Sequence, residues 1–213
     1  MPLKKKPCQS WKLYVITDPV AAKRPLAEAV KAAVEGGASV IQLRDKKASD
    51  EELVRTAKRL LKITRPKRIP LIINDRVEVA KASGSDGVHL GQEDGSLREA
   101  RLVLGEKAII GRSTHSPDQA LAAEKEGFDY IGVGPVFQTP TKPSYLPVGL
   151  ELVRFAAKNI RIPFVAIGGI DALNVERVCQ AGAKSVAVVR AVIGTPDPKK
   201  AAETLLKSLR TKR

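Results

Sequence analysis

The amino-acid sequence predicts an α/β protein, a single (β/α)8 barrel (TIM barrel) with its active site at the C-terminal ends of the strands. Strand-like apolar runs recur about eight times, keep ending in polar or glycine residues, and are separated by amphipathic stretches. Strands that alternate with helical segments indicate parallel βαβ units, and eight units indicate a closed barrel. The runs are YVITD (14–18), VIQLRDK (40–46), LIIND (71–75), VHLGQED (88–94), IIGRST (109–114), YIGVGPVFQTPTK (130–142), FVAIGG (164–169) and VAVVRAV (186–192).

The intervening helices are predicted from apolar periodicity and from residues that begin or end a helix. The first follows the first strand over 26–37 and stops at two glycines. Ser49 and Glu52 resemble a capping box that opens the second helix. Later helices are expected to begin at Ser116 with Pro117 in the first turn, at Asp171, and near Asp197 and Pro198.

We expect one domain over residues 1–213, with a basic N-terminal extension over about residues 1–10. A chain of 213 residues is short for such a barrel and leaves little room for a second domain. The longest strand-end loop covers 138–149 and contains three prolines. Long loops on a rigid scaffold are usually functional or disordered, and its potential anion ligands favour function; a closing lid is one hypothesis.

Composition limits the classes of function. The chain carries 37 Lys and Arg against 23 Asp and Glu, a formal charge of +14. Aromatic residues make up only 4% and do not alternate with basic ones, so we expect anionic metabolites and no nucleic acid as partners. No apolar stretch approaches the roughly 20 residues that span a membrane, and the N-terminus lacks the apolar core of a secretory signal. A cytoplasmic location is expected, and the two distant cysteines predict neither a zinc site nor a disulfide framework.

Cations follow the second strand in an alternating pattern. Gln42, Arg44 and Lys46 would project to the same side of an extended chain, which in a barrel can be the interior mouth. Arg binds phosphate oxygens bidentately and Lys acts as a point charge, so the set suits a polyphosphate. The alternative is an exposed Arg/Lys pair just past the strand, although Gln42 lies within the apolar run and needs a partner if it is buried.

Carboxylates stand at the next two strand ends. Asp75 ends the third strand and Asp94 follows the fourth, and Mg²⁺ is typically held by one or two carboxylates together with substrate phosphates. The two carboxylates beside Arg44 and Lys46 therefore favour a metal–diphosphate site. The alternative is that either Asp caps the following helix. Of the two histidines, His89 is expected to be a hydrogen-bonded core residue, and neither His89 nor His115 is assigned a catalytic role.

A second anion site is predicted where the seventh and eighth strands end. Gly168 and Gly169 follow the seventh strand, and barrel phosphate sites are frequently built from the loops after strands seven and eight. A tight turn would explain the glycines equally well. A diphosphate site and a monophosphate site at one mouth would suit an enzyme that joins two phosphorylated molecules.

These motifs resemble the thiamine-phosphate synthase family over nearly the whole chain. The matching segments are QLRDK (42–46), IINDR (72–76), GVHLGQED (87–94), GRSTHS (111–116), GVGPVFQTPTK (132–142) and AIGGI (166–170). The resemblance implies a Mg²⁺-dependent transferase. Its thiazole substrate, a hydroxyethylthiazole phosphate or the carboxylated form, attacks the methylene carbon of hydroxymethylpyrimidine diphosphate, and thiamine phosphate and pyrophosphate are released.

The resemblance also implies roles for individual residues. Asp75 and Asp94 would bind Mg²⁺, and the catalytic residues would be Arg44, Lys46, Ser113 and Lys142. The pyrimidine diphosphate would be held by Gln42, Leu43, Arg44, Asp45, Lys46, Asn74, Ser113 and Lys142. The thiazole phosphate would be held by Thr139, Pro140, Thr141, Gly168, Gly169, Val189 and Arg190.

One position departs from the family pattern, because Arg190 stands where the family often has a small hydroxyl residue. Two other functions stay open: a thiazole tautomerase on the same barrel, and a non-catalytic barrel that binds nucleic acid. The tautomerase would not need Arg44, Lys46, Asp75, Asp94 and Lys142, and their presence argues against it. A homo-oligomer is possible.

Overall fold

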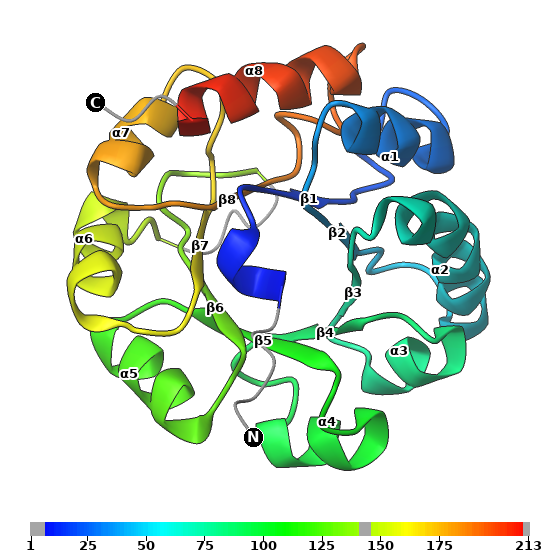
Figure 1. Ribbon diagram of the computed structural model, residues 1–213, viewed down its shortest axis with the longest axis horizontal. Helices are drawn as coiled ribbons and strands as arrows, with labels where there is room; N and C mark the ends of the chain where they lie inside the picture. Colours follow the sequence, from blue (N-terminus) through cyan, green and yellow to red (C-terminus); the bar gives the residue numbers. More distant parts are fainter. Residues whose placement is uncertain (1–6, 141–145, 211–213) are drawn as a thin grey trace.

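The computed structural model describes residues 7–140 and 146–210. Within these ranges eight parallel strands pair in chain order, and the eighth pairs with the first, so that the sheet closes into a barrel ringed by helices (Figure 1). The predicted fold class is confirmed. The strands are β1 (Leu13–Ile16), β2 (Val40–Leu43), β3 (Leu71–Asn74), β4 (Gly87–Leu90), β5 (Ile109–Thr114), β6 (Tyr130–Val133), β7 (Phe164–Ile167) and β8 (Val186–Val188).

Each strand is followed by a helix that covers the outside of the barrel. These helices are α1 (Leu26–Glu35), α2 (Asp50–Thr64), α3 (Val77–Ser83), α4 (Leu97–Leu104), α5 (Pro117–Glu126), α6 (Gly149–Asn159), α7 (Val175–Gln180) and α8 (Pro198–Arg210). Two short 3-10 helices, η1 (Pro7–Ser10) and η2 (Arg65–Lys67), complete the described elements. None of the described helices combines the length and the apolar character needed to cross a membrane.

The predicted helix starts are mostly confirmed. The Ser49 hydroxyl accepts a hydrogen bond from the Glu52 amide at 3.3 Å, and the Glu52 carboxylate accepts one from the Ser49 amide at 2.8 Å. The Ser116 hydroxyl caps α5 by accepting the Gln119 amide at 3.2 Å, with Pro117 as the first helical residue, but the Gln119 side chain accepts the His115 amide instead of completing a capping box. The prediction for Asp171 was wrong: its carboxylate accepts the amide of Leu173 at 2.8 Å and closes a separate turn, so that α7 begins only at Val175.

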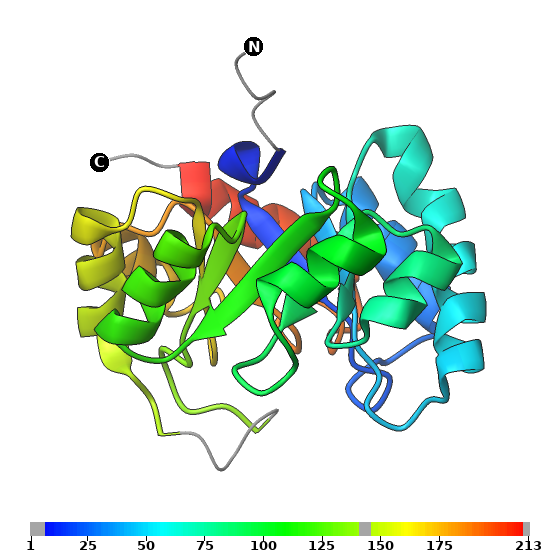
Figure 2. The same cartoon turned by 90° about the horizontal axis from the view of Figure 1, so that it is seen from below.

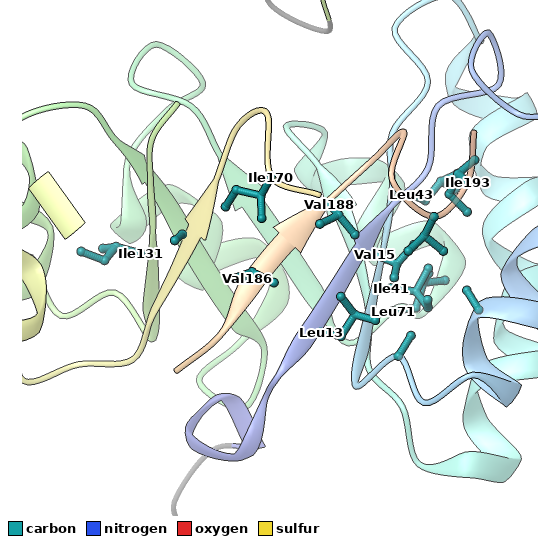
Figure 3. Packing of buried hydrophobic residues seen from close by; sticks show 14 of the residues in the cluster. Leu13, Val15, Ile41, Leu43, Leu71, Ile131, Ile170, Val186, Val188 and Ile193 are labelled. Atoms are coloured by element: carbon teal, nitrogen blue, oxygen red, sulfur yellow. The ribbon is translucent and has the colours of Figure 1, made fainter. Parts of the chain in front are cut away.

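Alternation along the strands produces two apolar layers. Outward-facing residues such as Leu13, Val15 and Ile41 pack against the helices in the larger core cluster (Figure 3). The residues between them face the barrel interior and form a second cluster. It contains Cys8, Trp11, Tyr14, Ile16, Val40, Ile72, Ile109, Tyr130, Val165 and Ala187. Both faces of the sheet are therefore largely apolar, one packing against the helices and the other filling the barrel interior.

The N-terminal end of the barrel is closed by η1, the dark-blue helix at the centre of Figure 1. Cys8 and Trp11 are 4% and 3% exposed and belong to the interior cluster. Figure 2 shows η1 at the end of the barrel opposite to the long loop between β6 and α6. Residues 7–10 of the predicted extension are thus part of the barrel, and the open mouth is the C-terminal one.

Candidate active site

A cavity of about 470 Å³ occupies the C-terminal mouth of the barrel. Most of the predicted substrate-binding residues in the described ranges line it. They are Gln42, Arg44, Asn74, Ser113, Thr139, Pro140, Gly168, Gly169, Val189 and Arg190. These residues come from six different strand ends and meet at one cavity, as the fold requires of a barrel site.

Polar side chains form the floor of this cavity. Strand alternation turns Gln42, Asn74, His89 and Ser113 toward the interior, just above the apolar layer. Room for them depends on a glycine: a Cβ at Gly111 would lie 2.2 Å from the ring of Tyr130. The absence of a side chain at Gly111 lets the Tyr130 ring cross the barrel and reach the polar floor.

A continuous chain of hydrogen bonds crosses this floor. The Gln42 amide nitrogen donates to the Tyr14 hydroxyl at 2.8 Å, and the hydroxyls of Tyr14 and Tyr130 lie 2.9 Å apart. His89 joins Tyr130 to Ser113, with Nδ1 2.9 Å from the Tyr130 hydroxyl and Nε2 3.0 Å from Ser113 Oγ. The expectation that a buried Gln42 needs a partner is confirmed, because Gln42 is only 3% exposed.

The two predicted cations differ in their surroundings. The strand β2 ends at Leu43, and the buried Thr17 fixes the next residue by accepting the Arg44 amide at 2.9 Å and donating to the Arg44 carbonyl at 3.1 Å. This places Arg44 on the cavity wall. Lys46 lies further out with a side chain that is 56% exposed, and its Nζ contacts Asp75 Oδ2 at 2.5 Å. The alternative of two exposed cations therefore fits Lys46 but not Arg44.

The predicted acidic pair lies together at the edge of the mouth. Asp75 directly follows β3 in the left-handed region with φ of 62°, which an Asp tolerates better than most residues. Asp94 accepts the Gly91 amide at 2.7 Å. Burial raises the pKa of Asp94, and the Asp75 carboxyl raises that pKa further through a hydrogen bond and its charge, which places the two carboxyls side by side.

Neither carboxylate caps an α-helix. The N-cap residue of α3 is Arg76, whose side chain makes no capping hydrogen bond, and the N-cap residue of α4 is Ser96. The helix-cap alternative is therefore wrong for both. Among the described residues no group of three or more His, Cys, Asp or Glu side chains gathers as a metal site, so Asp75 and Asp94 form an acidic pair.

Besides Lys46, two predicted residues in the described ranges, Leu43 and Asp45, do not line the cavity. Leu43 is 1% exposed and packs outward in the core cluster between barrel and helices. The Asp45 carboxylate accepts the amides of Lys47 and Ala48 at 2.9 and 3.2 Å and so faces its own loop. Thr141 and Lys142 lie outside the described residues.

Opposite the acidic pair, the cavity wall is mostly backbone. Gly168 and Gly169 both have positive φ, at 103° and 62°, and a Cβ on either would lie 2.5 Å from Pro135 or Gln138. The two explanations of these glycines, a tight turn and a close approach of the backbone, therefore both apply. After β8 the chain turns at once, and the amides of Val192 and Ile193 both donate to the Val189 carbonyl. The exposed Arg190 side chain lies at this turn and lines the cavity.

Sequence reasoning missed Tyr14 and Tyr130 and gave no site role to the histidines. All four residues line the cavity, and His115 Nδ1 lies 2.5 Å from the Gly134 carbonyl. A detectable signal existed, because Tyr14 and Tyr130 occupy inward positions of otherwise Val/Ile-rich strands. A buried phenol at such a position needs a hydrogen-bond partner.

Comparison with known proteins decides the family. A family model described as thiamine monophosphate synthase matches residues 13–192, which is most of the chain. The chain belongs to this family. The matched range begins at β1 and extends just past β8, so it includes every described strand.

Two curated family members illustrate the similarity. The thiamine-phosphate synthase of Chloroflexus aurantiacus is 44% identical over 197 residues, which cover 92% of this chain and 91% of that protein. The thiamine-phosphate synthase of Synechocystis sp. is 45% identical over 201 residues, which cover 94% of this chain. The chain spans only 58% of the length of the Synechocystis protein.

Solved structures agree with this family. A thiamine phosphate pyrophosphorylase from Pyrococcus furiosus has a TM-score of 0.87 and 41% identity over 95% of this chain and 96% of its own. A 3-hexulose-6-phosphate synthase, at 18% identity and a TM-score of 0.66, shares the barrel fold only.

Proposed function

We propose that this family member is a thiamine-phosphate synthase that joins hydroxymethylpyrimidine diphosphate to a hydroxyethylthiazole phosphate, with release of pyrophosphate. The observation that carries the proposal is the combination at one mouth of an acidic pair with two cations on one side and a backbone-lined wall on the other. The names of the relatives support the same reaction.

The diphosphate is assigned to the side where β2, β3 and β4 end. Arg44 lines the cavity and Lys46 lies beside Asp75, so both cations stand where a polyanion would arrive. Gln42, Asn74 and Ser113 add neutral hydrogen-bonding groups on the floor, which suit the pyrimidine ring and its amino group. Lys142 lies outside the described residues, and its role in holding the diphosphate is a prediction.

The acidic pair fits Mg²⁺ as a cofactor. Asp75 and Asp94 supply hard oxygen ligands. Burial raises the pKa of Asp94, and repulsion by the neighbouring Asp75 carboxyl raises it further, while the Gly91 amide and Lys46 lower it. A divalent cation would relieve this repulsion. When bound, Mg²⁺ supplies positive charge that neutralises the leaving diphosphate.

The thiazole phosphate is assigned to the opposite wall. The glycines after β7 allow close backbone approach, and the turn after β8 begins with Val189 and Arg190 at the cavity. Thr139 and Pro140 line the same cavity from the long loop. The exposed Arg190 guanidinium adds a positive charge at this wall, which suits a phosphate or a carboxylate on the thiazole.

This arrangement supports a reaction without a strong base or a covalent nucleophile. The thiazole nitrogen carries its own lone pair, and the diphosphate leaves readily once its charge is balanced. The aminopyrimidine stabilises the positive charge that develops at the methylene carbon, so bond breaking runs ahead of bond formation. Arg44 and Lys46 stabilise the leaving group, and the cavity walls align the two partners.

The test is pyrophosphate release in the presence of both substrates and Mg²⁺. We expect turnover that requires all three, and a fall of at least a hundredfold in kcat/KM for Arg44→Ala, because an interaction with a developing charge is lost. Arg55→Ala, on the exposed face of α2, removes the same charge away from the cavity and serves as the control. Isomerisation of a thiazole carboxylate phosphate without pyrophosphate release would contradict the proposal and indicate a tautomerase.

A further inference from the structure

We propose that Tyr14, Tyr130 and His89 form a hydrogen-bond relay of fixed direction, started by the Gln42 amide, that makes Ser113 a hydrogen-bond donor toward the cavity. The relay spans the interior faces of β2, β1, β6, β4 and β5 in turn. Its existence follows from the geometry alone, and only the identity of the acceptor above Ser113 rests on the proposed function.

The direction follows from counting protons. An amide nitrogen can only donate, so the Tyr14 hydroxyl accepts from Gln42, and we assign its single proton to the Tyr130 oxygen, the other group within hydrogen-bond distance of it. Tyr130 then holds one proton for its remaining partner, His89 Nδ1. A ring nitrogen that accepts is unprotonated, and in a neutral imidazole the proton must then be on Nε2.

The last step reaches Ser113. Because His89 Nε2 carries the proton, it donates to Ser113 Oγ across 3.0 Å. The Ser113 hydroxyl proton is then directed away from His89, and Ser113 lines the cavity. With the opposite direction, Ser113 would donate to His89 and present lone pairs to the cavity, which an anionic leaving group would repel. The Gln42 amide, on the far side of the barrel, thus determines that Ser113 donates a hydrogen bond to the cavity.

Burial keeps both phenols in the protonated form that the relay needs. Tyr14 and Tyr130 are 2% and 0% exposed. Loss of hydration raises the pKa of each well above its ordinary value, so neither phenol ionises at physiological pH.

The rings are also held in place from below. Trp11 packs edge-on against both tyrosines, with ring centroids 5.5 Å from Tyr14 and 4.9 Å from Tyr130. The tight fit of Tyr130 against Gly111 limits its movement from the other side. Closing the barrel with η1 and Trp11 therefore supports the relay as well as the core. We class Tyr14, Tyr130 and His89 as positioning residues for Ser113.

The direct test is the tautomer of His89 by ¹⁵N NMR, which is practical because the chain has two histidines. We expect the wild-type protein at pH 8 to hold His89 in the Nε2–H form, since Nδ1 accepts from Tyr130. Tyr130→Phe removes that donor and should produce a mixture of tautomers. Thr114→Val is the matched control, because it removes a buried hydroxyl from the neighbouring position that bonds Gly132 outside the relay.

A wild-type His89 in the Nδ1–H form would overturn the proposal, whether or not any variant folds. If Tyr130→Phe is not folded, Tyr14→Phe interrupts the relay one step earlier, and its effect on the His89 tautomer is measured instead. An unchanged tautomer in a folded Tyr130→Phe protein would also overturn the relay.

Kinetics give a second readout. We expect Tyr130→Phe to lower kcat about tenfold, the worth of one well-placed hydrogen bond to a charged group, with less than a twofold change in KM for the pyrimidine diphosphate. In a Ser113→Ala background the same change should have no further effect, because the relay acts through Ser113. Absence of any turnover in the wild type would contradict the proposed function and leave the tautomer result standing. Independent, multiplicative effects of the two substitutions would contradict the relay.

Discussion

Asp75 and Asp94 place two carboxyls side by side at the barrel mouth, and without a bound cation the protein bears their repulsion. The raised pKa of Asp94 expresses this, with burial as the largest cause and Asp75 next. A carboxyl whose pKa is raised by folding lowers the stability of the folded protein as pH rises above the pKa that it has in the unfolded chain. At neutral pH the ionised Asp94 therefore lowers the stability of the folded protein.

The destabilising charge of Asp94 predicts the behaviour of Asp94→Asn. At pH 7 without Mg²⁺ the variant should unfold at a slightly higher temperature than the wild type, because it keeps an oxygen for the Gly91 amide but loses the unfavourable charge. The gain should vanish below about pH 3.8, where Asp94 is protonated in both folded and unfolded chains. Thermal denaturation at both pH values is the measurement. The control is Glu93→Gln, which removes the neighbouring charge, and an equal gain there would contradict the account.

The buried phenols make an alkaline prediction. Above about pH 10 the unfolded chain ionises both Tyr14 and Tyr130, whereas the folded protein keeps them protonated. In that range, ionisation of each of these tyrosines in the unfolded chain should lower the free energy of unfolding by about 1.4 kcal/mol per pH unit. Tyr14→Phe should therefore show a shallower fall than the wild type in urea denaturation between pH 9 and pH 11. Parallel curves would mean that Tyr14 is not a buried phenol.

Helix starts show which elements the sequence can predict and which it cannot. Short polar signals such as Ser49 with Glu52, or Ser116 with Pro117, predicted helix starts correctly because a cap acts within one turn. Asp171 carried a similar signal but bonds Leu173 in a turn of its own. A side chain that can satisfy either a turn or a helix is decided by the loop that precedes it, and that loop depends on tertiary packing.

One contact between elements should dominate stability at the N-terminal face. Arg101 of α4 donates to Asp129, before β6, at 2.8 Å, and their side chains are only 14% and 10% exposed. The same carboxylate accepts the Ile110 amide at 2.7 Å. Arg101→Leu should lower the free energy of unfolding by about 3 kcal/mol, because it removes the guanidinium that pairs with a buried carboxylate.

Chemical denaturation of Arg101→Leu checks this value. The matched control is Arg154→Leu, which removes an arginine from an ion pair on the surface of α6, where the partners are 53% and 84% exposed. That change should alter the free energy of unfolding by less than about 0.5 kcal/mol. Equal effects of the two substitutions would show that burial of the Arg101 pair contributes nothing.

For the protein as a whole, barrel topology explains both the success and the limit of prediction. The eight strand ends could be recognised in the sequence, and the fold then requires them to meet at one mouth, so Gln42, Asn74 and Ser113 were placed together correctly. The relay could not be predicted, because it joins Tyr14 to Tyr130 across 116 positions through the barrel interior. Such a contact depends on ring orientation and on the space left at Gly111.

The charges at the barrel mouth distinguish a metal–diphosphate site from a generally basic surface. The chain as a whole carries +14, yet the proposed diphosphate site includes a pair of acids. A surface that merely attracts anions would be weakened by such a pair. A site for a metal–diphosphate complex needs it, and so the requirement for Mg²⁺ separates the two cases.

Calorimetric titration of hydroxymethylpyrimidine diphosphate, with and without Mg²⁺, therefore tests the central claim most directly. We predict that binding to the wild type strengthens at least tenfold with Mg²⁺, and that Asp75→Asn and Asp94→Asn each abolish this gain while Glu93→Gln retains it. Binding that is equally tight without Mg²⁺, or a full Mg²⁺ effect in both variants, would contradict the assignment of Asp75 and Asp94 as its ligands.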